Sequence, residues 1–501
     1  MTDQYQRGQE LDVLAQEVDD AIAAQDTLQL KSLIATCEQL HATASDRDRV
    51  TLLYFASNAH DALRRHDSSD AGTLWKWDQP DAVASILCLR RAMIERGYAG
   101  IHPILRAQIA TNLANQLDYL GRQVEAVEHW DIALQAIPNF AMAHGNRAIG
   151  LIHLARGLYD EKQAALLLES AEQSLKRALE KDAVWESGNH PEARTSFELN
   201  LARVSERLGP IRDELKFDRK ALSLGEAPDE VAYRCWCLEE RLFLNPLNDI
   251  MTDPFAAQDV LHLPSHSYLI EETPRFPNYY NILKQEYVSA RFRLFNAREW
   301  DKDHIADRDV LLLDGADGGV FGHRVNELMM AFRAAYSLFD KIAVFLNDYF
   351  KVGLSPNHLH FRQVFERQVK GGGWQVHPVF QGSQNLRLRG LYFLGKDLFD
   401  DDFKAVAAPE AQELASIRNQ LEHRFLSLQF FPASQNSTEE HAYISVDDFQ
   451  DKTLRLLRLA RAALTYLSLT MRDEEERRAM ETDRNTVSVP IFALPIGRGR
   501  H

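Results

Sequence analysis

Three residues suited to phosphodiester chemistry lie close together near the carboxyl end of the sequence: Arg418, Asn419 and His423. A histidine titrates near ~6.5 and can therefore accept or give a proton at neutral pH. An arginine keeps its positive charge and offers a forked set of donors to two phosphate oxygens. An asparagine can orient the histidine or hydrogen-bond the phosphate. Together these side chains could transfer protons and stabilise negative charge at phosphorus.

Apolar residues at three- and four-residue spacing around this motif predict one helix from about Glu410 to Leu428. Its buried stripe would consist of Leu414, Ile417, Leu421, Phe425 and Leu428. Asn419 and His423 are i and i+4 neighbours that point nearly opposite this stripe. Arg418 lies at the edge of the stripe, about 140° from His423 at 100° per residue, so its long side chain must reach around the helix.

A plain solvated helix explains part of the same pattern. Arg418 and Glu422 are an i,i+4 pair of opposite charge, which is common on exposed helices and contributes only a few tenths of a kcal/mol. The Arg to His spacing is also not rare, because similar pairs occur at Arg96/His102, Arg122/His129, Arg147/His153 and Arg298/His304. Only Arg418 and His423 combine the Arg-Asn-x-x-x-His form with an amphipathic helix that has a long helix on either side.

The composition is that of a folded protein without a general attraction for nucleic acid. At 501 residues the chain is long enough for roughly two to four domains. Its 45% of hydrophobic and 26% of charged residues are typical of globular proteins. The net charge is −16, so the chain as a whole repels polyanions. These values argue against a protein that coats DNA, whereas an enzyme that engages a few nucleotides in a local cleft remains possible.

Cysteine usage and hydropathy indicate a cytoplasmic protein. The four cysteines are scattered, which fits a reducing compartment. The Cys235-x-Cys237 pair is expected to be buried packing rather than a metal site. The amino terminus has no apolar segment of signal-peptide type and no run of eighteen apolar residues occurs, so we expect no membrane span. The glycines of 315–319 and 371–373 lack the Lys-Ser/Thr of a phosphate-binding loop, and we expect no cofactor.

The amino-terminal half shows a small/large pattern of paired helices. Residues Asn112 to Asn139 resemble a tetratricopeptide repeat (TPR), in which small residues let two helices cross closely and a proline ends the second. A second unit opens at Ala141, with its second helix over Ala171–Leu179 after an insertion at Arg156–Leu168. A third unit is predicted over Leu201–Leu222. Such a solenoid can bind a protein or peptide on its concave face, pack against another domain, or act as a scaffold without a ligand.

The chain divides into four predicted regions. These are a TPR-like solenoid (1–225), an irregular proline-rich connector (226–277), a helical domain (278–475) and a tail (476–501). Within the helical domain, long helices are expected over Tyr279–Arg298, Val325–Phe350 and Val446–Met471. Val310–Leu313 is expected to be a short strand or a buried extended piece. Arg455, Arg458 and Arg461 lie on one stripe of the last helix, which predicts either a solvated face or a ridge that contacts phosphates.

A helical domain of this layout, with Arg-Asn-x-x-x-His in its penultimate core helix, resembles the HEPN superfamily. Residues 230–475 resemble the bacterial HEPN family that carries a TPR-like amino-terminal region, through the stretches Cys235–Cys237, Leu242–Asp249, Ala331–Lys341 and Ile417–His423. The resemblance implies a four-helix up-and-down core, a dimer with its active cleft at the interface, and RNA cleavage without a metal. Many such proteins are toxins or antiphage defence effectors, and some have lost catalysis.

We therefore expect a mainly α protein that is an RNA endonuclease, with Arg418, Asn419 and His423 as catalytic residues and Arg455, Arg458 and Arg461 as substrate contacts. The neighbouring 2′-OH would attack phosphorus and leave a 2′,3′-cyclic phosphate and a 5′-OH. Each chain offers one histidine in this motif, so a symmetric homodimer would supply both an acid and a base. The alternative is a catalytically inactive TPR–HEPN interaction scaffold.

Overall fold

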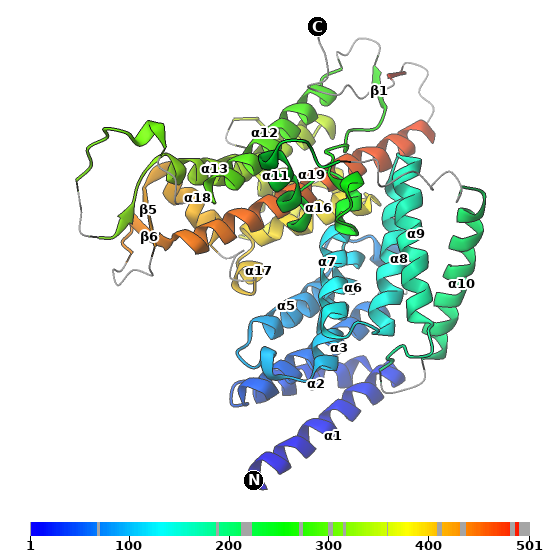
Figure 1. Ribbon diagram of the computed structural model, residues 1–501. Helices are drawn as coiled ribbons and strands as arrows, with labels where there is room; N and C mark the ends of the chain where they lie inside the picture. Colours follow the sequence, from blue (N-terminus) through cyan, green and yellow to red (C-terminus); the bar gives the residue numbers. More distant parts are fainter. Residues whose placement is uncertain are drawn as a thin grey trace.

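The protein is mainly α-helical, as its sequence predicts (Figure 1). The computed structural model describes residues 2–67, 71–186, 190–211, 223–269, 274–298, 304–313, 317–357, 359–407, 413–430, 437–480 and 486–489. No helix of this described part is long and apolar enough to cross a membrane.

Helices that follow one another in the amino-terminal half pack side by side: α2 with α3, α6 with α7, and α8 with α9. In Figure 1 they form the blue to teal stack. The bounds, with η for 3-10 helices, are α1 Thr2–Ala24, α2 Thr27–His41, α3 Asp46–Asp67, α4 Ala71–Leu74, α5 Pro80–Ile94, η1 Tyr98–Gly100, α6 Pro103–Tyr119, α7 Gln123–Ala136, α8 Ala141–Gly157, α9 Glu161–Ala178, α10 Pro191–Leu208 and η2 Gly209–Ile211.

Small residues allow these helices to approach closely, as the repeat pattern predicts. Trp130 of α7 is buried, and a Cβ on Gly150 of α8 would lie only 2.4 Å from its ring. The insertion expected before the second helix of the next unit is shorter than predicted. α9 already begins at Glu161, because the Asp160 side chain accepts hydrogen bonds from two backbone N–H groups of its first turn. Most of the second half of the third predicted unit, up to Leu222, lies outside the described residues.

The connector consists of short elements that begin at prolines. They are α11 Pro228–Glu239, η4 Pro246–Asp249 and η5 Pro254–Ala256, followed by β1 His266–Leu269, which pairs antiparallel with β7 Thr486–Val489. Proline suits the first position of a helix because its missing N–H would have no partner there. Of the Cys235-x-Cys237 pair, Cys237 is buried and Cys235 is half-buried, and all four cysteines are free thiols.

Four long helices form the carboxyl-terminal bundle: α12 Phe276–Ala297, α13 His323–Tyr349, α16 Leu386–Phe399 and α19 Val446–Met480. α19 packs against each of the other three. The smaller elements are η6 Ile305–Asp307, α14 Phe361–Phe365, β3 Glu366–Gln368, β4 Trp374–Val376, α15 Pro378–Gln381, α17 Asp401–Ala405 and α18 Leu414–His423. The four-helix core implied by the resemblance is thus present, while the exact boundaries of the four predicted regions stay a prediction.

A three-stranded sheet covers one end of this bundle, at the left of Figure 1. Its middle strand β5 (Phe425–Gln429) pairs antiparallel with β2 (Gly319–Val320) and parallel with β6 (His441–Ser445). Two sequence-based expectations are wrong here. The motif helix ends at His423 and its predicted continuation to Leu428 is strand, and Val310–Leu313 is exposed coil rather than a strand or a buried piece.

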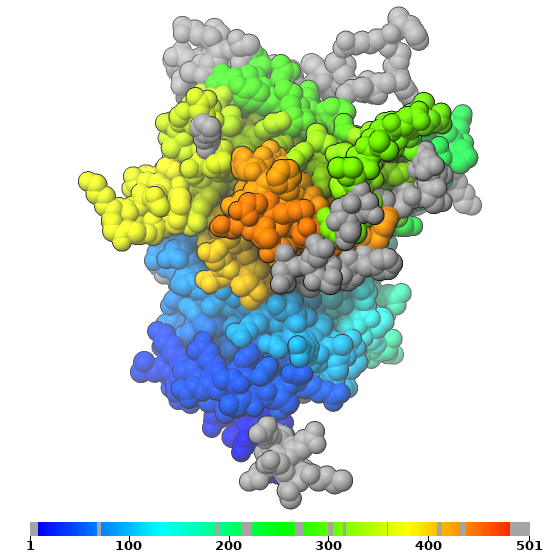
Figure 2. All heavy atoms as spheres, turned by 90° about the vertical axis from the view of Figure 1, so that its left-hand side faces the viewer, coloured from blue at the N-terminus to red at the C-terminus, as the bar shows by residue number. Residues whose placement is uncertain are grey.

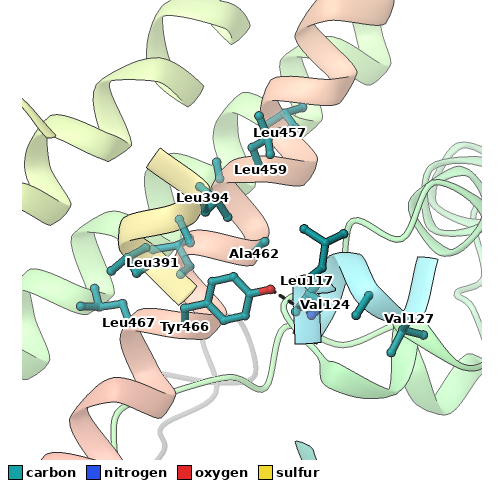
Figure 3. Packing of buried hydrophobic residues seen from close by; sticks show 14 of the residues in the cluster. Leu117, Val124, Val127, Leu391, Leu394, Leu457, Leu459, Ala462, Tyr466 and Leu467 are labelled. Atoms are coloured by element: carbon teal, nitrogen blue, oxygen red, sulfur yellow. Dashed lines mark hydrogen bonds between the residues drawn. The ribbon is translucent and has the colours of Figure 1, made fainter. Parts of the chain in front are cut away.

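Helices α3 and α5 to α10 share one hydrophobic core with the bundle, whereas α1 and α2 pack with α3 in a separate cluster. Figure 3 shows Tyr466 of α19 between the two, with its hydroxyl accepting a hydrogen bond from the backbone N–H of Val124 at 2.9 Å. The turn between α6 and α7 touches α16 directly, since a Cβ on Gly390 would lie 2.2 Å from the carbonyl oxygen of Gly121. The solenoid therefore packs directly against α16, which in turn contacts the motif helix α18.

Candidate functional site

The motif helix α18 presents one polar face and buries the other. Leu414, Ile417 and Leu421 are at most 6% exposed and pack towards α13 and α16. Asn419 and His423 are exposed on the opposite face. The predicted division of this helix into a buried stripe and a free polar face is therefore confirmed as far as His423.

The side chain of Arg418 lies between the two faces and is held by three groups. It donates a hydrogen bond to the Asn419 side-chain oxygen at 3.2 Å. Its guanidinium lies 3.9 Å from a carboxylate oxygen of Asp340 and 5.8 Å from the ring centroid of Tyr336, both on α13. With 27% of its side chain exposed, Arg418 keeps part of its surface open to a ligand while the rest is fixed in place.

Asp340 joins the motif helix to its surroundings. It accepts a hydrogen bond from the backbone N–H of Phe361 at 3.3 Å and lies 3.8 Å from His360. Burial raises the pKa of Asp340, although His360, the Phe361 N–H and Arg418 oppose that rise. Burial likewise raises the pKa of Tyr336 to about 12, so this side chain remains a neutral phenol beside Arg418.

Glu422 does not pair with Arg418 as a simple solvated helix would suggest. Its carboxylate lies 3.5 Å from the guanidinium of Arg333 on α13, and Arg333 also donates to the Leu421 carbonyl oxygen. The last turn of α18 is therefore tied to α13 through backbone and side chain together. This arrangement leaves the charge of Arg418 for Asp340 or for a ligand.

His423 is the last residue of α18 and faces solvent. Within the described part of the chain, no hydrogen bond or ion pair joins it to Arg418 or Asn419. The structure thus brings Arg418 and Asn419 into contact and leaves His423 one helical turn from Asn419, on the same exposed face.

The three arginines of α19 lie elsewhere, which corrects the predicted ridge facing phosphates. Arg461 is 2% exposed and is bound to Asp249 at 2.6 Å and to the Phe243 carbonyl oxygen at 2.6 Å. Arg458 pairs with Glu240 and Arg455 with Glu128, at 2.5 and 3.5 Å. α19 turns these side chains towards the connector and the amino-terminal helices, so they link parts of the protein rather than form an exposed surface.

Sequence reasoning did not identify Arg333, Tyr336 and Asp340 as neighbours of the motif. Their i, i+3 and i+7 spacing places them on one face of α13, and that signal is visible in the sequence. What the spacing lacks is any indication that this face meets α18, because that contact depends on how the bundle packs.

Comparison with known families identifies the carboxyl-terminal part. Residues 268–474 match the family model described as LA2681-like HEPN. This part of the chain is a HEPN domain. The match confirms the resemblance seen in the sequence, and the helical amino-terminal half is consistent with the TPR-like region that precedes such a domain. No curated protein and no solved structure matched the chain.

A HEPN domain indicates a function that involves RNA, since this superfamily generally includes ribonucleases. HEPN domains also commonly dimerise. Arg418, Asn419 and His423 lie inside the matched residues. The matched region also contains α13, whose side chains hold Arg418 and the end of α18.

Proposed function

We propose that the protein is a metal-independent RNA endonuclease of HEPN type. The observation that carries this proposal is the polar face of α18, where Asn419 and His423 are exposed beside an arginine that is partly exposed and fixed by neighbours. A helix that served only to fill the bundle would not need a histidine, an amide and a guanidinium on this side.

The residues fit the three demands of cleavage through the neighbouring 2′-OH. The nucleophile must lose a proton, the phosphorus must carry extra negative charge, and the leaving 5′-oxygen must gain a proton. His423 transfers protons, and Arg418 stabilises the charge on the phosphate oxygens. Asn419 accepts a hydrogen bond from Arg418 and has an amide N–H₂ left to bind the phosphate or His423. The products are a 2′,3′-cyclic phosphate and a 5′-OH.

One chain offers one motif histidine, although the reaction uses both an acid and a base. A symmetric dimer in which two copies of α18 face one another supplies both, because a two-fold axis brings the same face of each protomer together. The dimer also explains why the polar face of α18 is not covered within one chain.

Substitution at the motif tests the activity directly. In His423→Ala we expect cleavage of a mixed single-stranded RNA to fall by about a hundredfold or more, the usual contribution of a positioned acid or base. The control is His66→Ala, an exposed histidine at the end of α3. Cleavage by wild type should persist in EDTA and give cyclic phosphate ends. Equal behaviour of His423→Ala and wild type, or no cleavage by either, would favour the inactive interaction scaffold.

A mixed dimer tests the shared site. Wild-type and His423→Ala protomers with different tags can be co-expressed and the heterodimer purified through both tags. A site that needs both histidines predicts activity far below half of the wild-type value. Retention of half the activity would mean that each protomer has an independent site.

The cellular role that fits such a nuclease is that of a cytoplasmic toxin or antiphage defence effector. The TPR-like region, which is packed against the bundle, would bind a protein or peptide that triggers or restrains cleavage. Expression of wild type should then arrest growth, while His423→Ala should not.

A further inference from the structure

The sheet that follows the motif helix has one face in the core, and the other face is exposed at the Phe425 end of β5 and buried at Gln429. Val320, Leu426, Leu428 and Ile444 pack against the core on the inner side. Successive residues of a strand point to opposite sides, so the residues between them face outward. Those residues include Phe425 and Ser427 of β5, and His441 and Tyr443 of β6.

The open face is aromatic rather than aliphatic. Phe425 is 72% exposed, and His441 and Tyr443 are half-buried. Phe321, directly after β2, is 58% exposed. Its ring would lie 3.2 Å from a Cβ on Gly319, so the ring is on the side of the strand to which that Cβ would point. Figure 2 shows the segment with α18, β5 and β6 (gold to orange) reaching the surface on this side of the molecule.

The rings on β5 and β6 lie next to one another. The centroids of His441 and Tyr443 are 4.3 Å apart and those of Phe425 and His441 are 6.3 Å apart. His441 is held by Ser427, since its Nε2 lies 2.7 Å from the Ser427 hydroxyl oxygen. An exposed sheet face with adjacent aromatic side chains is the type of surface on which unstacked RNA bases are bound.

We propose that Phe425, His441 and Tyr443 form a platform that stacks a base of single-stranded RNA next to the cleavage site. This inference rests on the proposed function and adds a substrate subsite to it. Only Arg424 separates His423 at the end of α18 from Phe425 at the start of β5. A nucleotide whose base lies on the platform therefore has its sugar and phosphate within reach of the motif.

The charges around the platform indicate that it contacts RNA bases rather than RNA phosphates. Arg424 is exposed, but its guanidinium donates to the Glu439 carbonyl oxygen, and the exposed Glu439 and Glu440 lie just before β6. Acidic side chains here weaken the attraction for a polyanion, as does the net charge of −16. A second copy of the chain is the other occupant that an aromatic patch could have. The half-exposed histidine and tyrosine and the direct continuity with the motif favour RNA.

Binding can be measured without cleavage on a short 2′-O-methyl RNA that carries one 2-aminopurine. This RNA lacks the 2′-OH nucleophile, so the readout does not depend on catalysis. Wild type should quench the 2-aminopurine fluorescence, and Phe425→Ala or Tyr443→Ala should weaken binding by roughly 5- to 100-fold, the range of one lost base–aromatic stack. The Kd should change little with salt compared with a phosphate-dominated complex.

Matched variants separate stacking from other effects. Phe425→Trp should retain the quenching and Phe425→Leu should lose it, because leucine keeps apolar area without an aromatic face. Phe292→Ala on α12 is the control, since Phe292 is 47% exposed but packs edge-on against Tyr233 of α11. Circular dichroism and light scattering on each variant report the fold and the oligomeric state.

The outcomes are distinct. Quenching that is unchanged in Phe425→Ala and Tyr443→Ala overturns the platform, even when wild type cleaves RNA. Loss of the dimer in Phe425→Ala with unchanged quenching assigns the patch to a second copy and also overturns it. Quenching that depends on Phe425 in a protein that never cleaves RNA supports the platform and overturns the nuclease.

Discussion

Arg418 owes its position to a carboxylate on another helix. Asp340 lies 3.9 Å from it and is itself fixed by the Phe361 N–H, so Asp340 is a positioning residue in the proposed site. Because burial raises the pKa of Asp340, its ionised form is less favourable in the folded than in the unfolded chain. The protonated carboxyl of Asp340 therefore stabilises the fold fully only at a pH below the pKa that this group has in the unfolded chain. This contribution is lost as the pH rises through its pKa in the folded chain.

Asp340→Asn should consequently affect activity and stability differently. Loss of the ion pair should lower kcat/KM for RNA by up to about fivefold, which corresponds to a partly exposed pair. The free energy of unfolding at pH 7, measured with urea, should stay the same or rise, because the buried charge is removed while the amide still accepts from Phe361.

Asp348, two turns further along α13, provides a control of opposite sign. A hydrogen bond from Arg275 lowers the pKa of Asp348, so this carboxylate stabilises the fold above the unfolded pKa and loses that effect as the pH falls. Asp348→Asn should lower stability at pH 7. A loss of stability in Asp340→Asn, or unchanged kcat/KM, would contradict the positioning role.

For helices and strands, the sequence predicts those features that are set by residues close to one another along the chain. The buried stripe of α18 up to Leu421 and the long helices of the bundle follow from periodicity alone. The residue at which α18 ends does not follow from periodicity, because Phe425 and Leu428 are apolar at positions that suit both a helix and a strand. The segment forms a strand because it pairs with β6, whose residues come later in the chain.

The arginines of α19 show the same limit. The spacing of Arg455, Arg458 and Arg461 places them on one stripe but does not reveal which element covers that stripe. Asp249, Glu240 and Glu128, which pair with them, come from more than two hundred positions earlier in the chain. An arginine stripe bound by distant acids and one that contacts RNA look alike in a sequence.

The contact between the α6–α7 turn and α16 can be tested at Gly390. Alanine is normally the better helix former by about 1 kcal/mol. At this position, however, its Cβ would lie 2.2 Å from the Gly121 carbonyl oxygen, and Gly121 has a φ of +91°, so the turn has little freedom to move. Gly390→Ala should therefore lower the free energy of unfolding by about 1–3 kcal/mol, the usual effect of overpacking.

Gly382→Ala is the matched control, because no atom lies within 4 Å of a Cβ at that position. Urea unfolding of the two variants and of wild type gives the comparison. A Gly390→Ala protein that is as stable as Gly382→Ala would show that α16 and the turn separate easily, and the close contact would not anchor the solenoid.

In the whole molecule, a buried ion cluster joins the solenoid to the bundle. Asp397 of α16 is 3% exposed and binds Arg90 of α5 at 2.7 Å and Arg122, just before α7, at 2.6 Å. Burial raises the pKa of Asp397, but the two arginines outweigh it and hold the pKa well below its usual range. The carboxylate therefore stabilises the fold above the unfolded pKa near ~4, and this contribution is lost as the pH falls towards the folded pKa.

Asp397→Asn would remove the anion that Arg90 and Arg122 share and leave Arg122 with its ion pair to Glu125. Removal of one partner from a buried pair typically costs about 3–5 kcal/mol, so the urea midpoint should fall at pH 7 and differ less from wild type in acid. Asp401→Asn, at a side chain that is 95% exposed, is the control and should behave as wild type. Hydrogen exchange should speed up in α7 and α16 together, because both lose the same anchor. Faster exchange in only one of them would mean that the solenoid and the HEPN domain are not coupled through this cluster, and a signal on the TPR-like region would need another route to α18.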